Sequence, residues 1–421
     1  MNKKNNFCKL GNKTFFPKYN YYSNYDFITK YGIIDKGRIV TYDIPLENIN
    51  IQSFHFYISY YDNIIEIFPD LGWFTHIPSI KNGYYISDNY IARYIKNILT
   101  IFIKKEKLVK LFEKQYCKQL KLEDKKYIIK LRKENIKYRN KIKKNEIWII
   151  SDRPDKAGDN GEFFFRYLEK IKPKGVISYF VIKKNSSDYK RLKKYGNVLN
   201  LDSDKYLNLF LKADKIISSR FTPWVDNPFG EDRKYIRDLF HFDYIFLQHG
   251  ITKDDLSYTL NKLQKNYSLF ITSSKREYKS IFNYNYGYNK NNVILTGMAR
   301  YDNLYRLNKL IKREKIIFIA PTWRSNIKGT ANKIYYESIH SDTFKYTDYF
   351  KFYNNLVNDK KLIDIMEKFN YTGVFCLHPR FSSQYIDFSI NKIFSIEENC
   401  KLSKIFINIF FIGFRLFKFM L

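Results

Sequence analysis

The sequence predicts an α/β protein whose sheet is largely parallel. From residue 146 onward, short apolar runs alternate with polar, helix-compatible segments, as expected for strands joined by crossover helices. Several of these runs end in Ser, Thr, His, Gly or Arg, and open α/β sheets bind their ligands at such strand ends. The length of 421 residues allows about two or three domains, and 45% hydrophobic residues can supply their cores.

Residues 1–90 have a different composition. They are rich in Tyr, Phe, Ile and Asn, and strand-like runs such as 38–42 and 54–60 predict a β-rich accessory region. His55 and His76 lie here without partners suitable for metal ligation, so both are interpreted as structural. The scattered cysteines form no CxxC pair, and no metal or cofactor is predicted for the chain.

Residues 91–144 carry much of the positive charge. The formal net charge of the chain is +32, and a bias toward Lys, Asn, Ile, Tyr and Phe accounts for most of it but not for its uneven placement. This span lacks Pro and Gly, and its apolar residues recur at helical spacing, so a basic amphipathic helical segment is predicted. It is either a solvated connector or a helix pair on an anionic membrane surface. Nucleic acid is not a predicted partner, because no binding module accompanies the charge.

A first α/β domain is predicted over residues 145–308. Helices are expected from Glu162, over 186–195 and after Ser274, whose spacing to Glu277 is that of a capping box. The predicted strands cover 146–150, 176–182, 197–201, 215–219, 244–247, 268–272 and 293–295.

A partial second α/β domain is predicted over residues 309–400. Its strands at 316–320 and 374–377 end in the sequences PTWR and HPR, and a helix is expected near 361–369. Residues 401–421 form an apolar tail, which is too short to span a bilayer comfortably.

The sequence Gln248-His249-Gly250, which ends the 244–247 strand, is the centre of the predicted site. Histidine is the side chain whose ordinary pKa suits proton transfer near neutral pH. Gly250 is expected to let the chain turn and to let a substrate approach the backbone. The alternative is that His249 is only a hydrogen-bonded turn residue.

Other strand ends supply residues suited to a phosphorylated ligand. The guanidinium group of arginine offers phosphate a planar fork of donors. One histidine acting as a base, with a second histidine and arginines as phosphate ligands, would meet the needs of phosphoryl transfer. The candidates beside His249 and Gly250 are Asp152, Arg153, Gly297, Thr322, Arg324, His378 and Arg380.

Six segments between residues 146 and 388 also carry a family resemblance. They are SDRPDKAGDNGEFFFRYL (151–168), LQHGITKDDLSYTLNK (247–262), LFITSSKREYKSIF (269–282), LTGMARYDNL (295–304), APTWRSN (320–326) and CLHPRF (376–381). In this order they resemble the CDP-glycerol glycerophosphotransferase family, whose members build teichoic-acid-type and capsular polyol-phosphate polymers.

The resemblance implies a GT-B-like fold, with two Rossmann-like domains facing a cleft. It implies transfer of glycerol phosphate from CDP-glycerol to a polymer end with release of CMP, at the inner face of the cell membrane. His249 maps to the base on the acceptor hydroxyl and His378 to a contact with donor phosphate. On the donor side the expected residues are Thr322, Arg324, Arg380 and Gly297, and on the acceptor side Gly250, Asp152 and Arg153.

The sequence departs from the family after HPRF. The family continues there with a TDYSS-like motif that binds the pyrophosphate of the donor, and this chain continues with the apolar tail instead. A C-terminal truncation that impairs activity is therefore predicted. Two alternatives remain open: a GT-B glycosyltransferase that uses a nucleotide sugar, and a non-catalytic remnant that binds membrane or polymer.

Overall fold

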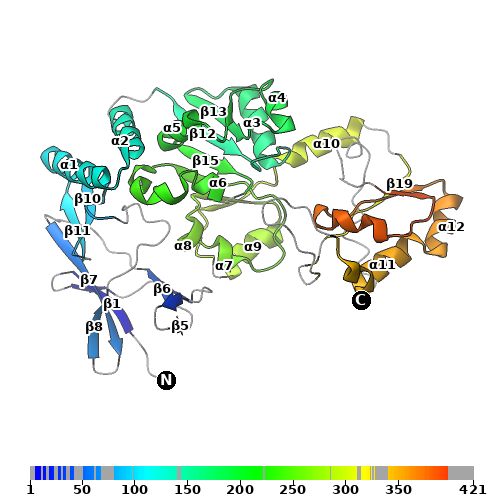
Figure 1. Cartoon of the computed structure of the whole chain (residues 1–421), viewed down its shortest axis with the longest axis horizontal. Helices are drawn as coiled ribbons and strands as arrows, with labels where there is room; N and C mark the ends of the chain where they lie inside the picture. The colour runs from blue at the N-terminus through cyan, green and yellow to red at the C-terminus, as the bar shows by residue number, and fades with distance from the viewer. Residues whose placement is uncertain are drawn as a thin grey trace. The chain divides into compact units, whose positions relative to one another are not determined.

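The computed structural model forms two compact units, Met1–Asn303 and Leu304–Leu421, and each is described by itself (Figure 1). The described residues are 5–10, 13–15, 19–22, 27–29, 32–34, 38–41, 51–60, 63–67, 80–96, 98–139, 144–220, 223–284, 286–310, 314–322, 324, 327 and 340–396. His76 and the predicted tail at 401–421 lie outside them.

The centre of the first unit is a seven-stranded parallel sheet, with strand order β14-β13-β12-β15-β16-β17-β18. The order reverses between β12 and β15, as in doubly wound dinucleotide-binding folds. The predicted α/β class is thus confirmed, and the seven predicted strands lie within one or two residues of those observed. These are β12 (Glu146–Ser151), β13 (Val176–Ile182), β14 (Val198–Asn200), β15 (Lys215–Ser218), β16 (Asp243–Phe246), β17 (Leu269–Thr272) and β18 (Val293–Leu295).

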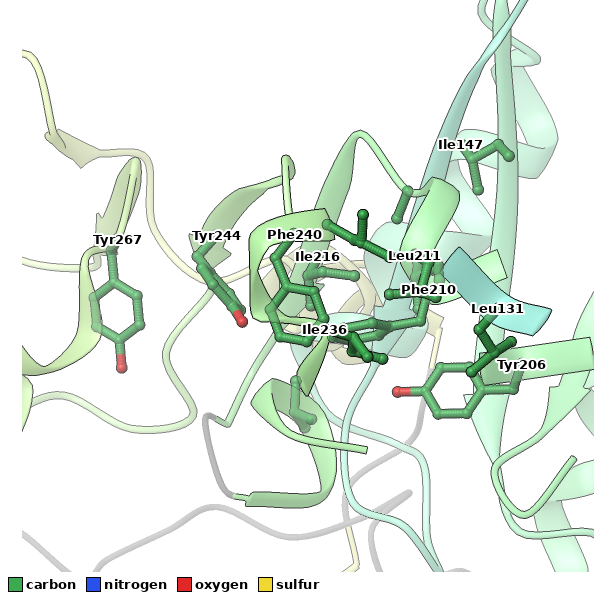
Figure 2. Close-up of a cluster of buried hydrophobic side chains, with 14 of the residues drawn as sticks. Leu131, Ile147, Tyr206, Phe210, Leu211, Ile216, Ile236, Phe240, Tyr244 and Tyr267 are labelled. Atoms are coloured by element: carbon green, nitrogen blue, oxygen red, sulfur yellow. The ribbon is translucent and has the colours of Figure 1, made fainter. Parts of the chain in front are cut away.

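Both faces of this sheet are buried, which accounts for the continuous apolar runs of its strands. Neighbouring residues of one strand point to opposite cores: Ile149 belongs to the same cluster as Phe210, and Ile150 belongs to the cluster of Phe165. Figure 2 shows part of the first cluster. The helices of this unit are α3 (Asn160–Ile171), α4 (Ser187–Leu192), α5 (Asp204–Lys212), α6 (Pro223–Asp226), α7 (Ser257–Leu260), α8 (Lys262–Lys265) and α9 (Lys275–Asn283), with the 3-10 turns η1 (Gly230–Tyr235) and η2 (Arg237–Leu239). Helix α10 (Arg300–Leu310) begins in this unit and ends in the second.

The N-terminal region, which was predicted to be β-rich, is described as antiparallel strands. Seven of them form one sheet of order β2-β1-β7-β11-β10-β9, with β8 paired to β7, and β3–β6 and β4–β5 form separate pairs. The strands are β1 (Asn5–Leu10), β2 (Lys13–Phe15), β3 (Tyr19–Tyr22), β4 (Phe27–Thr29), β5 (Gly32–Ile34), β6 (Arg38–Thr41), β7 (Ile51–Tyr60), β8 (Asn63–Ile67), β9 (Tyr84–Ile86), β10 (Tyr90–Ile95) and β11 (Ile98–Ile103).

The helical prediction for residues 91–144 is wrong for its first part. Strands β10 and β11 form a hairpin there, with Ile95 opposite Ile98. Lys96 has a φ of 49°, the left-handed conformation that a two-residue hairpin turn needs. The apolar spacing fits a helix, but Ile and Tyr dominate this stretch, and these residues pack better on a pleated surface.

Helices α1 (Glu106–Leu122) and α2 (Lys126–Arg139) follow this hairpin, and their apolar faces pack on the body of the unit. Figure 2 shows Leu131 of α2 beside Tyr206 of α5. Tyr116 in α1 donates a hydrogen bond of 2.8 Å to the backbone oxygen of Tyr235. The fold thus buries the apolar side of both helices, and the predicted contact of this segment with an anionic membrane surface stays a prediction. Their charged side remains exposed.

The second unit contains a small parallel sheet of order β19-β20-β21. Its core joins Phe344, Val357, Met366 and Phe375, which come from the helical segments and the central strand. The elements are β19 (Ile316–Ile319), η3 (Asp342–Tyr346), α11 (Asp348–Val357), α12 (Lys360–Lys368), β20 (Thr372–Phe375), η4 (Pro379–Asp387) and β21 (Phe394–Ile396). No helix in the described part of the chain has the length and apolarity needed to cross a bilayer.

Candidate active site

The carboxyl ends of β12 and β15 meet where the strand order of the large sheet reverses. The hydroxyl oxygens of Ser151 and Ser218 lie 3.1 Å apart there, and the backbone N–H of Ser219 donates to the oxygen of Ser151 at 3.3 Å. Doubly wound sheets bind their ligands at this position. Five of the candidate residues lie at this edge of the first unit, namely Asp152, Arg153, His249, Gly250 and Gly297.

The carboxylate of Asp152 is buried and holds the first turn of α3. It accepts backbone hydrogen bonds from Gly161 at 2.8 Å and from Asp159 and Glu162 at 3.0 Å. Burial, and then the charge of Asp159, raise the pKa of Asp152 to about 6, although the amide donors favour its charged form. A Cβ atom at Gly161 would lie 2.5 Å from the backbone oxygen of Ser151, so glycine allows this close approach. Arg153, the next candidate, is exposed.

His249 follows β16 through a strained turn. Gln248, and not Gly250, takes the left-handed conformation, with a φ of 60°. The side-chain oxygen of Gln248 accepts the backbone N–H of His249 at 3.2 Å, and its amide donates to the Thr252 hydroxyl at 2.7 Å. No atom lies within 4 Å of the position that a Cβ atom would occupy at Gly250, so the backbone there borders open space.

The imidazole of His249 is suited to accept a proton at neutral pH. Its Nδ1 lies 3.3 Å from the backbone oxygen of Ser219, which favours the tautomer with the proton on Nδ1 and a free lone pair on Nε2. The residue is exposed as a whole, but protein atoms crowd its ring. This partial burial lowers the pKa of His249 below its ordinary value. The positive charges of Arg220 and Arg300 lower the pKa further, whereas the negative charge of Asp159 raises it. The net shift favours the neutral form of the ring.

Arg300, at the start of α10, joins three segments of the site. Its guanidinium donates to the backbone oxygen of His249 at 2.9 Å and forms an ion pair with Asp159. Its backbone N–H donates to Asn160 at 3.2 Å, and Asn160 in turn donates to the backbone oxygen of Gln248 at 2.6 Å. Arg300, Asp159 and Asn160 were not predicted as site residues, although all three lie within the segments that carry the family resemblance.

Residues 248–252 are called the His249 loop. Glu277, the third residue of α9, holds the end of this loop at Thr252. Ser274 caps this helix as predicted, accepting the N–H of Glu277 at 3.1 Å. The Glu277 carboxylate is buried, however, and does not return to Ser274 as in a capping box. It accepts the backbone N–H of Thr252 at 2.9 Å and that of Ser273 at 2.7 Å, together with the Ser273 hydroxyl at 3.1 Å.

Gly297 lies between β18 and α10, with a φ of 84° that requires glycine. Its backbone N–H donates to the oxygen of Thr272 at 3.2 Å. Gly297 therefore belongs to the same unit as His249, and not to the unit that contains the other predicted donor-side residues.

In the second unit, the remaining candidates also follow the ends of parallel strands. Thr322 and Arg324 come after β19 and are exposed, and the guanidinium of Arg324 donates to the Thr322 backbone oxygen at 3.4 Å. His378 follows β20 and is partly buried, and its backbone oxygen accepts the N–H of Phe381 at 2.7 Å. Arg380 lies in η4. Among the residues with described coordinates, no cluster of His, Cys, Asp and Glu could hold a metal ion.

A doubly wound parallel sheet with this strand order defines a Rossmann-type α/β protein, a class that binds its ligands at the carboxyl edge of the sheet. Residues 133–408 match the family described as CDP-Glycerol:Poly(glycerophosphate) glycerophosphotransferase, and the chain belongs to this family. The resemblance found in the sequence is thereby confirmed.

One relative is the minor teichoic acid biosynthesis protein GgaB of Bacillus subtilis (strain 168). It is 45% identical over 242 residues, which are 58% of this chain and 26% of GgaB, so the chain spans about a quarter of that protein. The wall teichoic acid polymerase TagF is similar with a TM-score of 0.40 and 17% identity, over 70% of this chain and 71% of TagF. A UDP-GlcNAc 2-epimerase of Methanocaldococcus jannaschii is similar with a TM-score of 0.36 and 11% identity, over 60% of this chain and 73% of the epimerase.

Proposed function

We propose that this chain transfers glycerol phosphate from CDP-glycerol to a growing polyol-phosphate or capsular polymer and releases CMP. The observation that carries the proposal is the position of His249 past the carboxyl end of β16, with its Nδ1 3.3 Å from the backbone oxygen of Ser219, in a chain of this family.

In the proposed reaction His249 acts as the general base. Its Nε2 accepts the proton of the acceptor hydroxyl while the hydroxyl oxygen attacks the phosphorus of the glycerol phosphate group. The new phosphodiester bond forms as the bond from that phosphorus to the phosphate of CMP breaks, and CMP leaves with the electron pair. The contact between Nδ1 and Ser219 stabilises the imidazolium that results, because the N–H on Nδ1 then donates to a carbonyl oxygen.

The other candidate residues take the roles that the family resemblance implies. His378, Thr322, Arg324 and Arg380 neutralise the donor phosphates, since cationic and hydroxyl donors match the charge that develops on phosphate oxygens. Gly297 is proposed to border the donor. Gly250 and Arg153 border the acceptor, and Asp152 acts indirectly by fixing the start of α3. This division of roles corresponds to a GT-B arrangement.

The direct test is CMP release by the purified chain from CDP-glycerol with a polyol-phosphate acceptor. We expect His249→Ala to lower the rate by 100-fold or more, as is typical for loss of a general base. His55→Ala, on β7, is the matched control and should retain the wild-type rate. Turnover with nucleotide sugars in place of CDP-glycerol would identify a glycosyltransferase, and the absence of turnover with any donor would identify a non-catalytic binding protein.

We also propose that the chain works at the cytoplasmic face of the membrane, held there by charge. Four exposed lysines precede or begin α1 and form what we call the α1 lysine patch: Lys104, Lys105, Lys107 and Lys110. Because the apolar face of α1 is buried within the protein, the contact with anionic lipid is electrostatic and sensitive to salt.

A further inference from the structure

A cavity lies at the amino-terminal edge of the large sheet, opposite the edge that carries His249. It has a volume of about 280 Å³, and it is bordered by Asp243, the first residue of β16, and by Ser268, which precedes β17. His249 lies past the other end of β16, so this cavity is distinct from the candidate active site.

Two arginines dominate the polar lining of this cavity. Arg233 of η1 and Arg237 of η2 are each only 6% exposed. The guanidinium of Arg233 lies 5.1 Å from the ring centre of Phe240, and Arg237 lies in the short turn η2. Burial restricts both side chains, so less of their freedom is lost when they bind an anion.

The negative charge of the described lining is small and already engaged. Asp243 is its only carboxylate among the described residues, and this side chain lies 3.4 Å from Lys215 and accepts a hydrogen bond of 2.8 Å from Ser268. Among the described lining residues, arginines thus outnumber carboxylates, which favours an anionic ligand over a cationic one.

Aromatic rings form another part of the wall. The rings of Tyr85 and His241 are stacked at 5.9 Å, and those of Phe240 and Phe242 at 5.4 Å. Such rings pack against the carbon skeleton of a ligand while the arginines bind its charge. The cavity lies just below the usual lower limit of about 300 Å³ for ligand pockets, so it suits a small phosphorylated molecule better than a nucleotide diphosphate.

We propose that this cavity binds the phosphate ester of a small polyol, with the phosphate between Arg233 and Arg237. The preference for a polyol rests on the proposed function, whereas the preference for phosphate follows from the two guanidinium groups. The same chemical group occurs in free glycerol 3-phosphate and in the headgroup of phosphatidylglycerol.

The test measures binding of glycerol 3-phosphate to the full chain by calorimetry, without CDP-glycerol. Arg237→Gln should weaken binding about tenfold or more, because it removes a charge-assisted donor. Asn266→Asp should weaken the binding of glycerol 3-phosphate several-fold, because it adds a negative charge to the lining. Asp tolerates the left-handed φ of 47° at this position, so this variant should fold even if Arg237→Gln does not.

Arg276→Gln, which alters an exposed arginine on α9, is the matched control and should bind as the wild type does. His249→Ala should also bind normally, so a failure of the proposed transferase reaction would not be mistaken for a failure of this site. A parallel experiment measures binding of the chain to vesicles of phosphatidylglycerol and to vesicles of phosphatidylcholine. If binding to phosphatidylglycerol is stronger and is weakened by the Arg237 and Asn266 substitutions, the ligand of the cavity is a lipid headgroup. If neither glycerol 3-phosphate nor phosphatidylglycerol depends on these two residues, the proposal is overturned.

Discussion

The substitution Glu277→Gln tests whether the His249 loop must be held for activity. One carboxylate oxygen of Glu277 accepts two donors from Ser273, and the other accepts only the backbone N–H of Thr252, at 2.9 Å. Glutamine has a single acceptor oxygen, so it should keep that oxygen on Ser273 and place its NH₂ group against Thr252. The N–H of Thr252 then loses its acceptor, and the end of the His249 loop is released.

The size of the effect follows from the charge of the acceptor. A hydrogen bond to a charged group contributes about 1.5–3 kcal/mol, and Glu277 is 1% exposed, so water does not replace the lost partner. If the whole cost falls on the loop, CMP release should slow by roughly 10- to 100-fold. Thr252→Val should act in the same direction, because it removes the hydroxyl that the Gln248 side chain binds at 2.7 Å.

The assay is the rate of CMP release together with thermal unfolding of each variant. The control is Glu367→Gln, on the exposed side of α12, which should retain the wild-type rate. A Glu277→Gln protein that is folded and turns over at the wild-type rate would refute the view that Thr252 positions His249.

Three further outcomes are expected. When the pH is lowered, the rate of CMP release should fall with a midpoint below pH 6.5, because the base must be unprotonated and because burial and nearby cations lower the pKa of His249. Arg220→Gln should move this midpoint upward, since it removes one of the cations. An unchanged midpoint would count against this electrostatic account. Replacing the α1 lysine patch by Gln should weaken sedimentation with anionic vesicles several-fold at low salt, with unchanged binding to neutral ones. Gly161→Ala should destabilise the protein by about 1–3 kcal/mol in thermal unfolding, since its Cβ atom would press on the backbone of Ser151, and an unchanged melting temperature would contradict this.

The parallel sheet could be predicted from sequence because each strand is buried on both faces. A continuous apolar run that ends in polar residues and alternates with helical segments is typical of a strand in a covered parallel sheet. The hairpin of β10 and β11 was missed because its apolar pattern does not distinguish a strand from a helix. Ile95, Ile98 and Phe102 fit helical spacing as well as strand pairing, and the left-handed turn at Lys96 that decides between them has no strong sequence signal.

The site was predicted only as far as strand ends reveal it. His249 could be found because it closely follows an apolar run. The residues that end the neighbouring parallel strands then lie along the same edge of the sheet. The contacts that orient His249 could not be found, since Arg300 and Glu277 reach the loop from elements 51 and 25 residues away. Capping by Ser274 was predicted from spacing, yet the same spacing gives no sign that Glu277 turns toward Thr252 instead.

The packing of α1 and α2 depends on a buried ionic cluster, which a single substitution can test. The guanidinium of Arg132 is 1% exposed and binds Glu113 at 2.8 Å and Asp238 at 2.7 Å. It also lies 4.5 Å from the ring centre of Tyr116, so it contacts both helices and η2.

Arg132→Met fills a similar volume but leaves Asp238 buried without its cation. Removing one partner of a buried pair costs about 3–5 kcal/mol, so the free energy of unfolding in denaturant should fall by that amount. Lys133→Met, at an exposed neighbouring position, is the control and should change it little. Adding Asp238→Asn to Arg132→Met should restore part of the loss, because the uncompensated charge is then gone. If Arg132→Met costs less than about 1 kcal/mol, the cluster is solvated and the two helices are held by their apolar faces alone.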